Sequence, residues 1–101
     1  MIENLSRDDF EVLVICATRY ALGRQTYMPS MVQEIVQSHI SELTLPTLHI
    51  LTEDIEFAEH MALNGAPYAL GDKSIDAPGW LALKDRMKEE ENRRKEAEER
   101  G

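Results

Sequence analysis

The chain has 101 residues, which is enough for one small domain and too few for separate catalytic and binding domains. Hydrophobic residues make up 43% and charged residues 30%, so a disordered chain and a membrane-embedded chain are both disfavoured. No apolar run approaches the roughly 20 residues that cross a bilayer, and the first residues lack the pattern of a secretory signal. We therefore expect a cytoplasmic protein, consistent with a single cysteine, Cys16, that cannot form an internal disulfide.

Negative charge is concentrated in one part of the chain. The formal net charge is -8. Residues 84–101 contain seven basic and seven acidic residues, so the whole net charge belongs to residues 1–83. Such a surface repels phosphate backbones, which disfavours direct binding to nucleic acid. The simpler interpretation is that the charge serves solubility alone; if it does serve binding, proteins with basic surfaces are the favoured partners.

Apolar spacing predicts three helices in the first two thirds of the chain. The first begins after Ser6, a helix N-cap, and ends near Leu22, before Gly23. Its apolar residues lie on so many sides that we expect it to be the central helix. The second begins with a capping box of Ser30 and Gln33. The third begins at Thr44, with a proline in its first turn, and ends at a glycine, Gly65.

An irregular segment and a fourth helix follow. Glycines and prolines predict an irregular crossing over residues 65–79, anchored on the body by Tyr68, Leu70 and Ile75. The last helix opens at Trp80, and its apolar residues become sparse after a few turns. Beyond that point glutamates precede lysines or arginines by four residues, which favours a solvated helix.

These elements define the expected fold class and its division. We expect an all-α protein with a compact, acidic three-helix body over residues 1–83. Residues 84–101 are expected to form an extended charged C-terminal helix that projects into solvent. The alternatives for this segment are a helix that docks on a partner and a disordered tail.

The third predicted helix carries two sets of polar residues. His49, Glu53, Glu56 and His60 follow one another at steps of four, three and four, so they share one face. This spacing could hold a divalent metal ion, but a wet helix face is the simpler interpretation, and we expect no cofactor. The acidic residues of the same helix are predicted to form a protein-binding face, consisting of Glu53, Asp54, Glu56 and Glu59.

Signatures of catalysis are lacking in the sequence. Cys16 lies in the most apolar run of the chain, where we expect it to be buried and unreactive. The sequence contains no nucleophile elbow, Walker-type loop or dinucleotide fingerprint. We therefore predict a protein that is not an enzyme and has no catalytic residues.

The motif Arg19-Tyr20-Ala21-Leu22-Gly23-Arg24-Gln25-Thr26-Tyr27 gathers two guanidinium groups and two phenols near a helix end. In one interpretation it is a structural corner, in which Arg24 reaches the acidic third helix. In the other it is an anion-binding pocket for a phosphate or a nucleotide, formed by Arg19, Arg24 and Tyr27. The structural corner is the favoured interpretation.

This motif, followed by an amphipathic helix and by Asp54-Ile55-Glu56, resembles a group of small proteins that bacteriophages and prophages encode. The resemblance covers roughly Phe10 to Trp80. The group has no assigned activity, so the resemblance implies a source more than a function. Phage accessory proteins of this size often bind and disable, or redirect, a host protein.

The expected function is therefore non-enzymatic binding of a host or phage protein in the host cytoplasm. The acidic face would cover a basic, nucleic-acid-binding surface of a host defence or nucleic-acid-processing factor. The alternatives are a small-ligand or divalent-metal binding protein, and a dimeric structural protein. We expect no direct contact with nucleic acid or with a membrane.

Overall fold

A computed structural model describes residues 6–24, 29–64 and 77–100 of the chain. These residues form four α-helices, one 3-10 turn and no strand, so the predicted all-α class is confirmed for the described part of the chain. The elements are α1 (Arg7–Arg24), α2 (Pro29–Ser38), η2 (Ile40–Glu42), α3 (Leu45–Leu63) and α4 (Ala77–Arg100). The predicted anchors Tyr68, Leu70 and Ile75 lie outside the described residues, as does Gly65.

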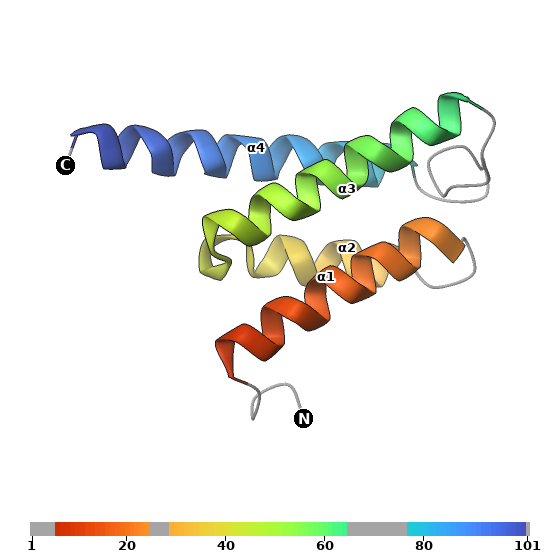
Figure 1. Ribbon diagram of the computed structural model, residues 1–101, viewed down its shortest axis with the longest axis horizontal. Helices are drawn as coiled ribbons and strands as arrows, with labels where there is room; N and C mark the ends of the chain where they lie inside the picture. The colour runs from red at the N-terminus through yellow and green to blue at the C-terminus, as the bar shows by residue number, and fades with distance from the viewer. Residues whose placement is uncertain (1–5, 25–28, 65–76, 101) are drawn as a thin grey trace.

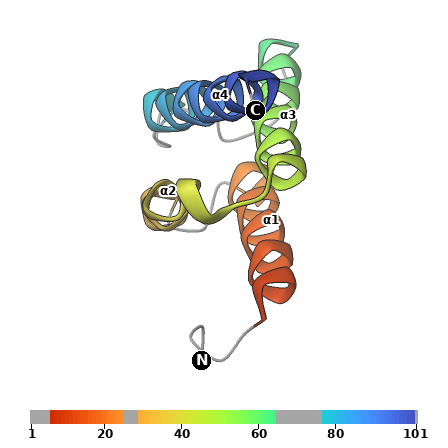
Figure 2. The ribbon, with the colours of Figure 1, turned by 90° about the vertical axis from the view of Figure 1, so that its left-hand side faces the viewer.

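The four helices pack in a ring, as the end-on view in Figure 2 shows. Both α2 and α3 pack against α1 on one side and α4 on the other. The resulting molecule is flat, with extents of 44 × 33 × 16 Å. In Figure 1 the C-terminal turns of α4 extend past the neighbouring helices at the left.

The core is centred on α3 rather than on α1. Leu48, Leu51 and Ile55 of α3 are all 0% exposed. By contrast, Val12 and Leu13 of α1 are 58% and 46% exposed, so the prediction that α1 is the central helix was wrong. Apolar side chains occupy more of the circumference of α1 than its two neighbours can cover.

The helix starts largely follow the predicted caps. The Oγ of Ser6 accepts the backbone N–H of Asp9 at 3.2 Å, which confirms this N-cap. Helix α2 begins at Pro29, one residue before the predicted cap at Ser30. Thr44 precedes α3 as predicted, but its hydroxyl donates to a carboxylate of α1 instead of accepting a bond from an amide of its own helix.

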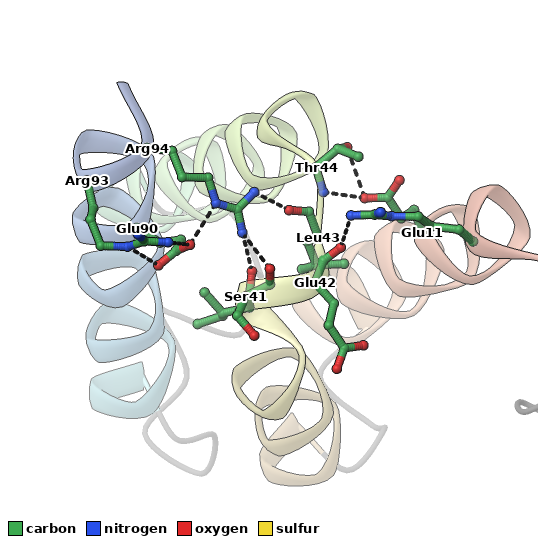
Figure 3. A network of polar contacts seen from close by, with 10 residues as sticks. Glu11, Ser41, Glu42, Leu43, Thr44, Glu90, Arg93 and Arg94 are labelled. Carbon is green, nitrogen blue, oxygen red and sulfur yellow. Dashed lines mark hydrogen bonds and ion pairs between the residues drawn. The ribbon is translucent and has the colours of Figure 1, made fainter. Parts of the chain in front are cut away.

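That carboxylate belongs to Glu11, a buried acidic residue that joins α1 to the start of α3 (Figure 3). Its Oε2 accepts the backbone N–H of Thr44 at 2.7 Å and the Thr44 hydroxyl at 2.9 Å. Burial raises the pKa of Glu11, but hydrogen bonds from Thr44 and Thr47 and the charge of Arg7 outweigh it and lower the pKa below its ordinary value. The charged carboxylate is thus satisfied where it lies.

Helix α4 is part of the body and not a separate tail. The expected boundary at residue 84 falls inside one continuous helix, in which Met87 is 0% and Glu91 7% exposed. Arg94 Nη2 donates to the carbonyl oxygens of Ile40 at 2.9 Å and Ser41 at 3.0 Å, and its Nη1 donates to that of Leu43 (Figure 3).

The prediction that residues 84–101 form a solvated helix is therefore wrong for residues 84–94, which pack against the rest of the chain. Carbonyls at the end of a helical run lack intrahelical donors, and a guanidinium supplies several donors at once. Because the acceptors are main-chain atoms of residues 40–43, no side chain in the sequence signals this contact. Beyond Lys95 the described side chains are exposed, which agrees with the expected projection into solvent for that end only.

Candidate functional site

The four acidic residues of the predicted protein-binding face each have a cationic or imidazole partner within the chain. Glu53 contacts His49, and Asp54 Oδ2 lies 2.7 Å from Arg19 Nε of α1. The remaining two pair with α4: Glu56 with Lys88 at 3.4 Å and Glu59 with Lys84 at 3.2 Å. These carboxylates thus face four different partners, and three of the contacts link α3 to α1 or α4, which leaves less uncompensated charge for an external protein.

The alternative metal site on α3 is likewise occupied by internal contacts. His49 Nδ1 lies 3.7 Å from Glu91 Oε2 of α4, in addition to its contact with Glu53. The imidazole of His60 lies beside Asn64, with its Nε2 3.5 Å from Asn64 Nδ2. In the described ranges no group of three or more histidine, cysteine or acidic side chains is placed to hold a metal ion.

The arginine and tyrosine corner joins α1 to α3. Arg19 makes the contact that was expected of Arg24, and the hydrogen bond and charge of Asp54 raise the pKa of Arg19. A hollow of about 280 Å³ lies beside this pair, between the end of α1 and α3. The Arg24 side chain and Tyr27 lie outside what the structure describes, so the anion pocket remains a prediction. Its one described cation, Arg19, is already paired.

Cys16 is exposed, contrary to the expected burial. It lies three residues after Leu13 and four before Tyr20, on the side of α1 that the other helices leave uncovered. Leu13 and Tyr20 are themselves exposed. The apolar run that predicted burial of Cys16 therefore continues onto the surface.

An uncovered apolar hollow lies between α1 and α2, a place that sequence reasoning did not select. A hollow of about 150 Å³, which we name the α1–α2 groove, is lined only by apolar side chains. They are Phe10, Leu13, Val14, Ala17, Met31, Val32, Ile35 and Val36. The signal that could have found it is the excess of apolar residues in α1 over what one buried stripe requires.

A second hollow continues the groove toward the start of α1. This polar hollow has a volume of about 570 Å³ and shares Phe10 with the α1–α2 groove. The Phe10 and His39 rings lie 5.1 Å apart between their centroids and are tilted by 58°. Its other lining residues are Ser6, Arg7, Glu11, Ser41 and Glu42. The apolar groove and the polar hollow thus meet at the Phe10 side chain.

Exposed carboxylates of α1, α2 and η2, of which only Glu42 lines one of the two hollows, have no cationic partner within the described residues. Asp8 and Asp9 lie in the first turn of α1, Glu34 lies one turn after Met31 on α2, and Glu42 lines the polar hollow. All four side chains are exposed, and none forms an ion pair within the described residues. The nearby cation, Arg7, donates from Nη2 to the main-chain oxygen of Glu42 and not to its carboxylate.

Comparisons with protein-family models, with curated proteins and with solved structures gave no match for this chain. None of the described helices combines the length and apolar character that crossing a membrane requires. The functional interpretation therefore depends on the geometry and charge described above.

Proposed function

We propose that this chain is a non-enzymatic binding protein that associates with another protein through the face formed by α1 and α2, and that the partner presents a basic surface. One observation carries the proposal. An apolar groove lies between two helices of an acidic molecule, and these helices carry exposed carboxylates that pair with no cation of the described residues. Uncovered apolar patches with polar rims are typical of protein interaction sites.

The acidic residues of α3 are a weaker candidate for the same role. Glu53, Asp54 and Glu56 already interact with groups of the chain, so an external cation would have to compete with His49, Arg19 and Lys88. Among the described residues, Asp9, Glu34 and Glu42 have no cationic partner with which an external cation would have to compete. The net attraction for a basic partner is therefore expected to be larger at the groove.

The resemblance to phage and prophage proteins supports a host or phage protein as the partner. A basic surface on such a partner would in many cases be one that contacts nucleic acid. Binding there would block that contact by occupying the surface, in a one-to-one complex and without any chemical step.

Quantitative capture from a host lysate tests the proposal with three matched variants. The groove variant, Glu34→Lys/Glu42→Lys, reverses two charges that have no ion-pair partner among the described residues. The α3 variant, Glu53→Lys/Glu56→Lys, reverses two charges that have internal partners. The control variant, Glu98→Lys/Glu99→Lys, reverses two exposed charges at the end of α4. All three change the net charge equally. We expect the first variant to lose most of the captured protein and the third to retain it.

Two results would contradict this proposal. If the wild-type chain captures no protein in stoichiometric amount, the binding function is wrong. If the α3 variant loses the partner while the groove variant retains it, the site is the predicted acidic face and not the α1–α2 face. Circular dichroism of each variant verifies that the helices remain folded.

A further inference from the structure

We infer that the α1–α2 groove accepts one amphipathic, cationic α-helix of the partner protein. This inference rests on the proposed function and adds the chemistry of the bound segment. The groove is lined by eight apolar side chains and has a volume of about 150 Å³. Small-molecule sites typically measure about 300–1,000 Å³, so the groove fits a few side chains of a larger partner better than a whole ligand.

The length and composition of the groove favour a helix as the bound segment. On α1 it runs from Phe10 to Ala17, which spans roughly 10 Å at 1.5 Å per residue, about two helical turns. A helix that lies in such a groove presents anchors at positions i, i+3 or i+4, and i+7. The described chain has no strand whose edge could pair with an extended peptide, so strand addition is not available there.

The charges beside the groove specify the flanks of that helix. Asp9 precedes Leu13 by one turn on α1, and Glu34 follows Met31 by one turn on α2, so each helix that forms the groove carries an exposed carboxylate one turn from a lining residue. Glu42 adds a third carboxylate at the polar end. Lysines or arginines on either side of the apolar stripe of the bound helix would meet these groups without displacing an internal partner.

A second copy of this chain is a poorer occupant. Each copy has a net charge of -8, and a symmetric contact would bring the same carboxylates together. The apolar groove alone does not exclude such a dimer, so the experiment includes it as an outcome that would overturn the inference.

The probe is a synthetic helix of about 18 residues, longer than the ~12–15 residues that marginally stable helices need in water. It carries leucines at positions i, i+3, i+4 and i+7 and lysines elsewhere. Two comparison peptides have the same leucines with glutamates in place of the lysines, and the same leucines and lysines in scrambled order. Fluorescence anisotropy of labelled peptide measures each Kd on the full-length chain at pH 7.

Two protein variants locate the binding. Leu13→Ala/Ile35→Ala shortens two partly exposed groove residues, and Val12→Ala/Leu63→Ala shortens two exposed apolar residues outside the groove. We expect the first variant to weaken binding of the lysine peptide at least about tenfold, as for interface anchors. The second should stay within about twofold. Bound peptide should also slow alkylation of Cys16, the single cysteine, which is exposed beside Leu13.

The inference is overturned if the lysine peptide binds no better than the scrambled or the glutamate peptide, or if it binds both protein variants equally. It is also overturned if sedimentation shows a dimer at pH 7 that Leu13→Ala/Ile35→Ala dissociates, because a second copy would then occupy the groove. Failure of the peptide alone leaves the lysate result standing. A protein captured through Glu34 and Glu42 would then bind by a surface other than a cationic helix.

Discussion

Glu90 shows how a single carboxylate can depend on its neighbours along one helix. Arg93 donates to both of its oxygens, at 3.2 and 2.7 Å, and Arg94 Nε donates to Oε2 at 2.7 Å. Hydrogen bonds from Arg93 and, to a smaller extent, from Arg94 lower the pKa of Glu90. Although burial acts in the opposite direction, the pKa falls from its ordinary 4.5 to about 2. The same contact orients Arg94 toward the carbonyls of residues 40–43.

The pKa of Glu90 predicts a pH dependence of stability. Because its folded value lies below its unfolded value, its contribution is complete above pH 4.5 and is lost as the pH falls toward about 2. We expect Glu90→Gln to lower the Tm at pH 6 and to lose less further stability than the wild type between pH 5 and pH 3. Thermal unfolding followed by circular dichroism at each pH measures both effects.

Glu89→Gln is the matched control, because Glu89 is far more exposed and its nearest cation, Arg86, lies 3.8 Å away. It should follow the wild type across the same pH range. Parallel pH curves for the wild type and Glu90→Gln would show that the arginine contacts do not persist in solution.

Helix α4 is held at several points along its length. Trp80, Leu83 and Met87 are buried against the other helices, and Arg94 bonds to main-chain oxygens seven residues after Met87. Glu91 also accepts the Thr52 hydroxyl of α3 at 3.3 Å. The helix thus closes the ring of helices instead of extending from a finished three-helix body.

Two truncations of α4 are predicted to differ sharply. Ending the chain after Leu83 removes Met87, whose burial accounts for about 2–5 kcal/mol, and Arg94, whose charged hydrogen bonds add about 1.5–3 kcal/mol. Together these approach the 5–15 kcal/mol that stabilises a typical domain. We expect this variant to lose cooperative thermal unfolding. Ending the chain after Lys95 removes only residues whose described side chains are exposed, so its Tm should stay near that of the wild type.

If the chain that ends at Leu83 unfolds cooperatively near the wild-type temperature, then residues 1–83 are a self-sufficient domain, as the sequence alone suggested. Tryptophan fluorescence adds an independent readout, since Trp80 remains in both truncated chains and is buried in the complete one.

The helices themselves were largely predictable from local signals. Ser6 caps α1 and Thr44 precedes α3 as predicted, and Leu48, Leu51 and Ile55, spaced by three and four residues along α3, are all buried. These features depend on side chains within a few residues of one another, which is the range over which caps and helical periodicity act.

Packing between the helices was not predictable in the same way. The apolar residues of α1 nearly surround it, so periodicity could not tell that Leu13 and Cys16 would remain exposed. The contacts of Arg94 are made with main-chain oxygens, which every residue possesses and which leave no pattern in the sequence. Consequently the α1–α2 groove and the docking of α4 beyond Leu83 were both missed, whereas the acidic residues of α3 were selected without knowledge of their internal partners.

For the molecule as a whole, charge and apolar surface have opposite effects on association. The net charge of -8 makes two copies repel each other at pH 7, while Leu13, Met31 and Ile35 leave apolar surface uncovered along the groove. A basic partner removes the conflict, because it neutralises the charge and covers the groove at once. Repulsion between copies should therefore be the main barrier to self-association.

This balance predicts self-association near the isoelectric point, pH 4.8. As the net charge approaches zero, repulsion vanishes while the apolar groove is unchanged, so the mean mass from light scattering should rise above that of a monomer between pH 7 and pH 4.8. Leu13→Ala/Ile35→Ala should suppress the rise, and Val12→Ala/Leu63→Ala should suppress it less, because only the first pair lines the groove. A mean mass that stays that of a monomer at pH 4.8, or that rises equally in both variants, would contradict this prediction. The α1–α2 groove would then not be the surface through which copies associate when their charge repulsion is removed.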